Sequence, residues 1–204
     1  MIAIVDYGLG NIKAFYNLFR KLNINSYFAR SSKELKKATK IILPGVGSFD
    51  YAMTMLEQSK LRHTLDDLVL NKKIPVFGIC VGMQIMSDTS EEGILKGLGW
   101  VPGIVRKINV ENEISKYPLP HMGWNKVTLG LNDPLFENLE ANPLFYFLHS
   151  YYFECKDNSS SLATVDYGKK ITCILKHKNI YGIQCHPEKS HYNGETILKN
   201  FSNL

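Results

Sequence analysis

The chain has 204 residues, of which 45% are hydrophobic and 21% charged, and its formal net charge is +5. This composition excludes intrinsic disorder, and the length fits one α/β domain over residues 1–204. The scattered basic residues, without interleaved aromatic residues, argue against nucleic-acid binding, and no apolar run approaches the roughly 18 residues of a membrane span.

The N-terminal third alternates between strand and helix patterns. Residues 2–5 are apolar without a basic start, which predicts a first strand rather than a signal peptide. Gly8 and Gly10 begin a dinucleotide-binding fingerprint that fails at Lys13, so a tight turn is favoured there. Asn11 is positioned to cap a helix with apolar side chains at helical spacing (Ile12, Phe15, Phe19, Leu22).

Two further strand and helix units follow. Residues 27–29 form a strand candidate, and Ser31 and Glu34 have the spacing of a capping box. The strand at 41–43 enters a glycine-rich loop, Pro44-Gly-Val-Gly47, whose exposed backbone N–H groups favour a ligand. Ser48 can cap the next helix, and a second helix is predicted from the spacing of Leu61, Leu65, Leu68 and Val69.

The stretch from Ile74 to Gln84 predicts a strand, a tight turn and a helix. An apolar run ends at Cys80, which lies between Gly78 and Gly82, and Met83 and Met86 then follow at helical spacing. This is the layout of a nucleophile elbow, in which the start of the helix favours a thiolate and the Val81 amide can donate to an oxyanion. A buried structural cysteine is the alternative. The alternating order predicts a mostly parallel sheet, with Cys80 and the Pro44–Gly47 loop at the ligand-binding carboxyl ends of its strands.

From about Gly97 the pattern changes to short strands joined by turns, which predicts an antiparallel or mixed region. The expected strands are 101–110, 126–128, 145–153, 162–167, 171–175 and 180–186. Asp133 begins a turn into a brief helix, and residues 195–201 are expected to form the terminal helix.

A cysteine nucleophile needs a base and a group that orients this base. His63 and His177 have polar neighbours typical of surface, and His121 and His149 could contact a substrate or simply pack. His186 ends a predicted strand and is followed two residues later by Glu188. In extended chain these two side chains share a side, so Glu188 could orient the imidazole.

Metal binding competes for some of the same side chains. Cys173, His177, Cys185 and His186 could be ligands, but their spacing fits no usual zinc pattern. We therefore expect no metal or cofactor. Cys155, Cys173 and Cys185 are expected to pack as small apolar groups, and the irregular cysteine spacing favours a reducing, cytoplasmic compartment.

At these residues the chain resembles the class I (triad-type) glutamine amidotransferases, and more narrowly the glutaminase subunits of imidazole glycerol phosphate synthase. The resemblance extends from residue 6 to residue 190. It is carried by Asp6-Tyr-Gly-Leu-Gly-Asn11, Pro44-Gly-Val-Gly47, Gly78-Ile-Cys-Val-Gly-Met-Gln84, His121-Met-Gly-Trp-Asn125, His149-Ser-Tyr151 and His186-Pro-Glu-Lys-Ser190.

The resemblance implies a flavodoxin-like fold and hydrolysis of L-glutamine through a Cys80 thioester, with His186 and Glu188 completing a triad. Val81 and either Val46 or Gly47 would form the oxyanion hole. Gln84, Glu92, Ser150 and Tyr151 would hold glutamine. The ammonia would pass to a (β/α)8-barrel cyclase in a heterodimer, to make imidazole glycerol phosphate and aminoimidazole carboxamide ribotide in histidine biosynthesis. Trp124, Lys189 and Tyr146 would lie at the interface with the cyclase, although a core tryptophan and a surface lysine would fit the same sequence.

Two positions depart from this family. Cys185 replaces the usual phenylalanine before the histidine, and residues 191–194 read His-Tyr-Asn-Gly. A paralogous glutaminase that supplies another acceptor, such as a surface-sugar synthase, is therefore an alternative. A non-enzymatic scaffold for a barrel partner and a cysteine peptidase are alternatives of other classes.

Overall fold

A nine-stranded sheet runs through the molecule, whose computed structural model describes residues 1–110, 115–130 and 132–204. Its strand order is β2 (Ser26–Ala29), β1 (Ile2–Val5), β3 (Lys40–Gly45), β4 (Val76–Cys80), β12 (Ile180–Ile183), β11 (Lys170–His177), β10 (Ser161–Asp166), β7 (His121–Leu129) and β8 (Leu144–His149). The first five strands are parallel, and the pairings from β12 to β8 are antiparallel. The expected α/β fold, a mostly parallel sheet with an added antiparallel region, is confirmed.

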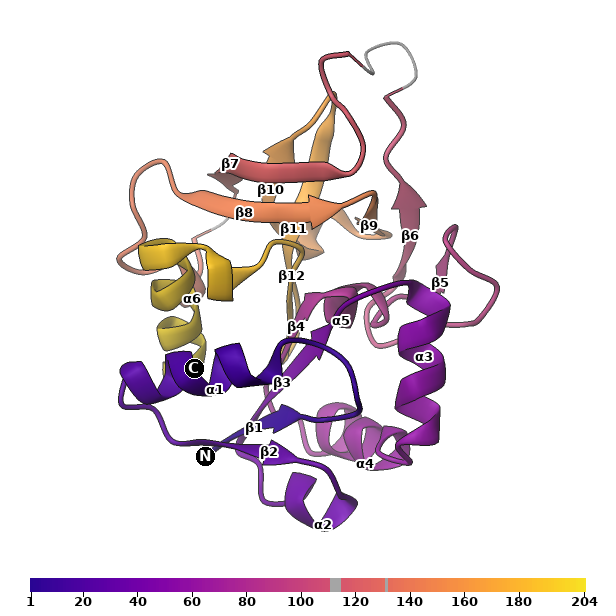
Figure 1. Cartoon of the computed structure of the whole chain (residues 1–204), viewed down its shortest axis with the longest axis vertical. Coiled ribbons are helices and arrows are strands. Elements are labelled where there is room, and N and C mark those ends of the chain that lie inside the picture. Colours follow the sequence, from indigo (N-terminus) through magenta and orange to yellow (C-terminus); the bar gives the residue numbers. More distant parts are fainter. Residues whose placement is uncertain (111–114, 131) are drawn as a thin grey trace.

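Helices cover both faces of the parallel half. α1 (Ile12–Lys21) and α6 (His191–Asn203) lie on one face, and α3 (Phe49–Gln58) and α4 (Arg62–Asp66) on the other (Figure 1). A π-helical turn, Asp67–Asn71, continues α4, whereas α2 (Ser32–Leu35) and α5 (Val81–Gln84) are single turns. Short 3-10 helices at Pro134–Phe136, Asn158–Ser160 and Pro187–Lys189 complete the helical elements of the described residues.

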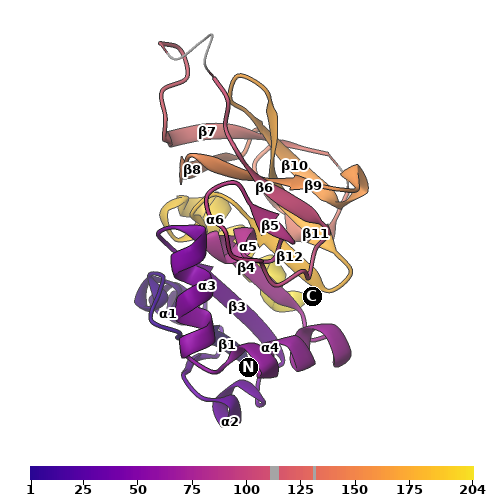
Figure 2. The same ribbon diagram turned by 90° about the vertical axis from the view of Figure 1, so that its right-hand side faces the viewer.

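A second, three-stranded sheet contains β5 (Thr89–Ser90), β6 (Gly103–Lys107) and β9 (Tyr151–Cys155), on the side that faces the viewer in Figure 2. The single strand predicted at 145–153 is therefore wrong. The chain leaves the large sheet after His149, Ser150 accepts a backbone hydrogen bond from Ile108, and β9 then pairs with β6. Aromatic residues typical of strands lie on both sides of His149 and Ser150, so the sequence pattern does not show that the chain changes sheets there.

Two of the three predicted helix caps are wrong and one is confirmed. Ser31 and Glu34 form the expected capping box, and Asp133 accepts from the Leu135 amide. Asn11 and Ser48 stand at N-cap positions but make no side-chain cap hydrogen bond to the described residues. At α3 the carboxylate of Glu92 accepts from the Phe49 amide instead, at 2.8 Å. A distant loop thus supplies the cap that the local sequence suggested.

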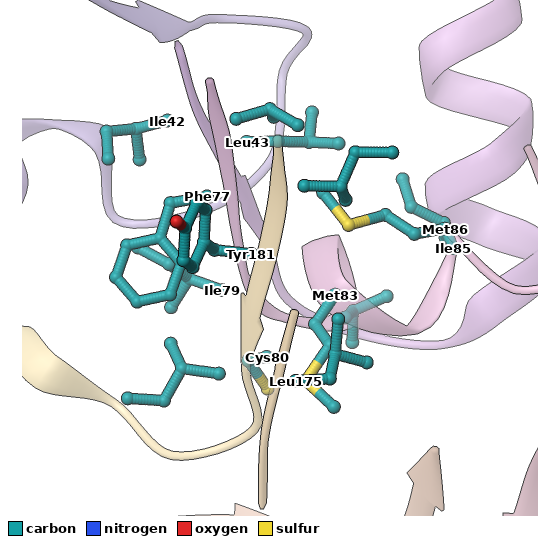
Figure 3. Packing of buried hydrophobic residues seen from close by; sticks show 14 of the residues in the cluster. Ile42, Leu43, Phe77, Ile79, Cys80, Met83, Ile85, Met86, Leu175 and Tyr181 are labelled. Atoms are coloured by element: carbon teal, nitrogen blue, oxygen red, sulfur yellow. The ribbon is translucent and has the colours of Figure 1, made fainter. Parts of the chain in front are cut away.

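The core is densest around β4, whose five residues are all buried. Phe77 and Tyr181 pack on one side of the strands, and Met83 and Leu175 pack on the other (Figure 3). An apolar run buried on both faces is what a central parallel strand requires. The end of β4 is therefore held rigidly, and Cys80 stands at that end.

Candidate active site

Cys80 occupies a strained turn between β4 and α5. Its backbone has φ +55° and ψ −116°, a left-handed conformation that a non-glycine residue adopts at a cost of about 1–3 kcal/mol. A Cβ added at Gly82 would lie 1.9 Å from the Leu43 carbonyl oxygen, and one at Gly78 would lie 2.7 Å from the Gly82 oxygen. The two glycines are required because backbone passes on both sides of the cysteine, as expected for a nucleophile elbow.

The helix after Cys80 is shorter than the sequence predicts. α5 ends at Gln84, so Met86 lies beyond it, although both methionines are buried. The dipole of a helix grows with its number of aligned peptides, and one turn supplies little of it. Negative charge on the Cys80 sulfur therefore depends mainly on neighbouring side chains.

His186 reaches the site from β12, the strand that pairs in parallel with β4. Its Nδ1 lies 2.9 Å from Glu188 Oε1, and both side chains are more than 90% buried. The extended geometry expected for this pair is wrong, because Pro187–Lys189 forms a 3-10 turn with proline at its start. The turn nevertheless brings the carboxylate back onto the imidazole, and it leaves Nε2 to face the cysteine.

The charge state of His186 follows from its two partners. Burial disfavours the imidazolium, but hydrogen bonds with Cys80 and Glu188, together with their attraction for positive charge, raise the pKa of His186 to about 10. The second carboxylate oxygen of Glu188 is buried and has no hydrogen-bond partner among the described residues. Protonated His186 beside Cys80 is the arrangement of a thiolate–imidazolium pair.

The loop after β3 borders the same space. Gly45 is in register with Cys80, so Val46 and Gly47 come directly beside the turn, and Gly47 has φ +90°. The buried hydroxyl of Tyr7 donates to the Pro44 carbonyl at 2.7 Å and fixes the start of this loop. Sequence reasoning missed Tyr7, because residues 6–11 indicated only a tight turn.

A cavity of about 280 Å³ opens above Cys80. It brings together the residues predicted to act in catalysis, in the oxyanion hole and in glutamine binding: Cys80, His186, Glu188, Val81, Val46, Gly47, Gln84, Glu92, Ser150 and Tyr151. Lys189 also lines it, whereas the other two predicted interface residues do not. Glu92, which caps α3, contributes its carboxylate to the lining of the cavity.

A chain of amide groups connects Gln84, which lines this cavity, to the sulfur of Cys80. Gln84 Nε2 donates to the Tyr151 carbonyl and to Gln184 Oε1, both at 3.0 Å, and Gln184 Nε2 donates to the Cys80 sulfur at 3.8 Å. Gln184 was not among the predicted site residues. Its position two residues before His186, in the segment that follows β12, is the sequence signal that could have indicated it.

A histidine pair closes the wall formed by the antiparallel strands. His121 Nδ1 lies 3.0 Å from His149 Nε2, and His149 Nδ1 lies 2.8 Å from the Tyr151 carbonyl. Burial lowers the pKa of His121 to about 4 and that of His149 to about 3. Both imidazoles are therefore neutral at pH 7 and support the segment that carries Ser150 and Tyr151.

The remaining two predicted interface residues lie on the outer face of β7 and β8. Trp124 is opposite Tyr146 in register and is 46% exposed, which excludes the core tryptophan considered from sequence. Lys189 Nζ lies 5.4 Å from the Tyr146 ring centre, and the Trp124 ring stacks on His191 at 5.0 Å. Met122, Leu144 and Leu148 are exposed on the same two strands.

In the part of the chain that the structure describes, no group of three or more His, Cys, Asp or Glu side chains could hold a metal ion. Cys173 and Cys185 are completely buried, and burial raises the pKa of both thiols. Within the same residues no helix is long and apolar enough to span a membrane.

Comparison with known sequences identifies a family over almost the whole chain. The profile of the family described as "Glutamine amidotransferase class-I" matches residues 3–203. A protein of Leptospira interrogans named imidazole glycerol phosphate synthase subunit HisH is 52% identical over 204 residues, which cover all of both chains. A protein of the same name from Bdellovibrio bacteriovorus is also 52% identical over 204 residues, again covering both chains completely.

Solved structures share the fold at lower identity. A putative GMP synthase protein from Thermoplasma acidophilum has a TM-score of 0.73 at 22% identity, covering 99% of this chain and 92% of that one. PurLQS from Thermotoga maritima has a TM-score of 0.72 at 18% identity, covering 99% and 97%.

Proposed function

Because the chain belongs to the class-I glutamine amidotransferases, and within them to the HisH family, we propose that it is the glutaminase subunit of an imidazole glycerol phosphate synthase. Residues 1–204 would act as one domain that hydrolyses L-glutamine to glutamate and ammonia without a cofactor. The observation that carries the proposal is the meeting of Cys80, His186 and Glu188 in a cavity that is also lined by the carboxylate of Glu92.

The reaction begins at the Cys80 sulfur. The thiolate attacks the side-chain amide carbon of glutamine, and the carbonyl oxygen becomes an oxyanion. The Val81 amide, together with that of Val46 or Gly47, donates to this oxygen. As the C–N bond breaks, His186 gives its proton to the departing nitrogen, and ammonia leaves behind a thioester.

Hydrolysis of the thioester restores the enzyme. His186, now neutral, takes a proton from water, which attacks the thioester carbon. The second tetrahedral intermediate expels the Cys80 thiolate and leaves glutamate. Glu188 holds the imidazole by Nδ1 throughout, so that Nε2 serves both steps.

Four residues would position the substrate. Glu92 suits the α-ammonium group by charge. Ser150, between β8 and β9, and Tyr151, the first residue of β9, would contact the α-carboxylate. Gln84 is held by two hydrogen bonds at the edge of the cavity. A carboxylate for the α-ammonium group, together with hydrogen-bonding groups for the α-carboxylate, suits a free amino acid and argues against a peptidase.

The ammonia would pass to a cytoplasmic (β/α)8-barrel cyclase in a heterodimer, where it would enter the synthesis of imidazole glycerol phosphate and aminoimidazole carboxamide ribotide. The outer face of β7 and β8 is the proposed contact surface, with Trp124, Tyr146 and Lys189 at its centre. Trp124→Ala is expected to weaken binding of the cyclase, measured by calorimetry. Tyr51 is an exposed residue on α3, and Tyr51→Ala should leave this binding unchanged. Equal binding by both variants would contradict this surface.

The glutaminase proposal is tested with the electrophilic glutamine analogue 6-diazo-5-oxo-L-norleucine. We expect one adduct, on Cys80, by peptide mass spectrometry, and protection by excess glutamine. The Cys80→Ser variant should carry no adduct. Absence of modification at Cys80 in the complex with the cyclase would overturn the proposal and would favour a non-enzymatic scaffold.

The ammonia acceptor requires a separate test, because this chain departs from the family pattern at Cys185 and at residues 191–194, where His191 stacks on Trp124 of the proposed contact surface. Glutamine-dependent formation of imidazole glycerol phosphate by the mixed subunits would support the histidine pathway. If Cys80 reacts with the glutamine analogue but the mixed subunits form no imidazole glycerol phosphate, a paralogous glutaminase is favoured. Such a protein would serve another synthase, such as one that aminates surface sugars.

A further inference from the structure

Gln184 is a completely buried polar residue in direct contact with the proposed nucleophile. It follows β12, and its backbone amide donates to the Cys173 carbonyl at 2.8 Å, which anchors the residue in the sheet. Its side chain then runs from Gln84 to the sulfur of Cys80. A primary amide is costly to bury unless its polar atoms find partners, so this placement calls for an explanation.

The direction of the Gln184 amide is fixed by the groups behind it. The Tyr151 carbonyl can only accept, so the end of Gln84 that faces it must be the NH₂ group. The same NH₂ group faces Gln184, so Gln184 must present its oxygen there. Its own NH₂ group is consequently turned toward the sulfur, at 3.8 Å.

We propose that Gln184 is a thiolate-binding residue, whose amide N–H stabilises negative charge on the Cys80 sulfur. It would act in the resting enzyme and again when the sulfur leaves the thioester carbon. A hydrogen bond to the charged form favours that form. The inference rests on the proposed function only in taking Cys80 as the nucleophile.

The surroundings of the sulfur leave a role for such a donor. His186 faces it from the turn after β12 with Glu188 behind the ring, and the hydroxyl of Tyr7 approaches from the loop after β1. The Tyr7 hydroxyl donates its hydrogen bond to the Pro44 carbonyl, so it has no second donor for the sulfur. Burial, together with the charge of Cys80, raises the pKa of Tyr7, which keeps the hydroxyl protonated. Cys185 is buried nearby and, as a neutral thiol, is at most a weak donor. The dipole of α5, a helix of a single turn, adds little stabilisation of negative charge on the sulfur.

The test measures the alkylation of Cys80 by iodoacetamide as a function of pH, without glutamine. Gln184→Met keeps the length of the side chain and removes the donor, and Gln184→Glu replaces the amide with a carboxyl group. We expect the midpoint of alkylation to rise by about one pH unit in Gln184→Met and further in Gln184→Glu. Gln58→Met, at the exposed end of α3, is the matched control and should keep the wild-type midpoint.

Thermal unfolding of each variant separates loss of structure from loss of the donor. Folded variants with the wild-type midpoint would overturn the proposal, even if their turnover fell, because a packing role alone would not move this pH profile. If neither variant folds, ¹⁵N-labelled wild-type protein provides the answer. The Gln184 side-chain amide signals should shift with the same midpoint as the alkylation of Cys80, and signals that do not respond would overturn the proposal.

The outcome is separable from that of the glutaminase proposal. A shifted alkylation midpoint in a protein whose Cys80 does not react with the glutamine analogue would support Gln184 and reject the glutaminase. An adduct on Cys80, with an unchanged alkylation midpoint in the Gln184 variants, would support the glutaminase and reject the role of Gln184.

Discussion

The parallel and antiparallel halves of the large sheet divide the work of the site between them. β3, β4 and β12 end at the same edge, and they carry the oxyanion loop, Cys80 and His186 on backbone packed too closely to accept a methyl group at Gly45, Gly78 or Gly82. β7 and β8 instead alternate buried and exposed residues. The residues proposed for catalysis thus lie where the backbone is too closely packed for an added methyl group, and those proposed to bind the partner lie where one face of the sheet is exposed.

Removing the sulfur should have the largest effect. Cys80→Ala is expected to lower kcat for glutamine hydrolysis by at least about 10³-fold, since no other described residue that lines the cavity can form the thioester. Release of ammonia from the complex is the measurement. Cys155→Ala is the control, because burial raises the pKa of this thiol to about 11 and it lies outside the cavity. Comparable loss in both variants would mean that the defect is structural.

The difference in backbone packing can be tested with two glycines. Gly82→Ala would place a methyl group 1.9 Å from the Leu43 oxygen and is expected to cost at least about 3 kcal/mol of unfolding free energy. Gly123→Ala on β7 meets no atom of the described residues within 4 Å, so only its positive φ opposes it, at about 1 kcal/mol. Urea unfolding measures both. Similar losses of unfolding free energy in the two variants would contradict the proposed difference in backbone packing between the parallel and antiparallel halves of the sheet.

The histidine pair predicts an acid-sensitive antiparallel half. In the unfolded chain both imidazoles become protonated as the pH falls below about 6.5, whereas in the folded chain the pKa values of about 4 and about 3 keep them neutral. The unfolded state binds more protons in this window, so stability should fall by about 2 kcal/mol per pH unit between about pH 6 and pH 4.5. Urea titrations at several pH values measure this slope.

The double variant His121→Phe with His149→Gln should flatten that slope. His63→Gln, a change at an exposed histidine on α4, should leave it as it is. A wild-type slope in the double variant would assign the acid sensitivity to other groups.

The smallest expected effect concerns the loop that carries Glu92. Asp50 on α3 accepts from the amides of Ile94 and Leu95 at 3.0 and 3.1 Å, and so holds this loop against the helix. Asp50→Ala should raise KM for glutamine about three- to tenfold with little change in kcat, because it displaces a binding group and no reacting atom. Thr54→Ala, one turn further along α3, is the control. A fall in kcat at constant KM would contradict this role.

Sequence patterns predicted correctly those features that depend on interactions between neighbouring residues. The buried strand before Cys80, the capping box at Ser31 and the turn at Asp133 follow from neighbouring residues, and the structure contains all three. The strand change at Ser150 and the capping of α3 by Glu92 depend on segments distant in the chain, and sequence reasoning placed them incorrectly. Gln184 was overlooked for the same reason, since its partners Gln84 and Cys80 lie about a hundred residues away.

The central place of β12 has a consequence for the protein during its synthesis. This strand pairs with β4 on one side and β11 on the other, and it brings Gln184 and His186 to a cysteine made 104 and 106 residues earlier. A growing chain on the ribosome therefore carries an unpaired thiol until the last strand inserts between its neighbours. The same insertion joins the two halves of the sheet, so the proposed nucleophile would become active only when folding is nearly complete.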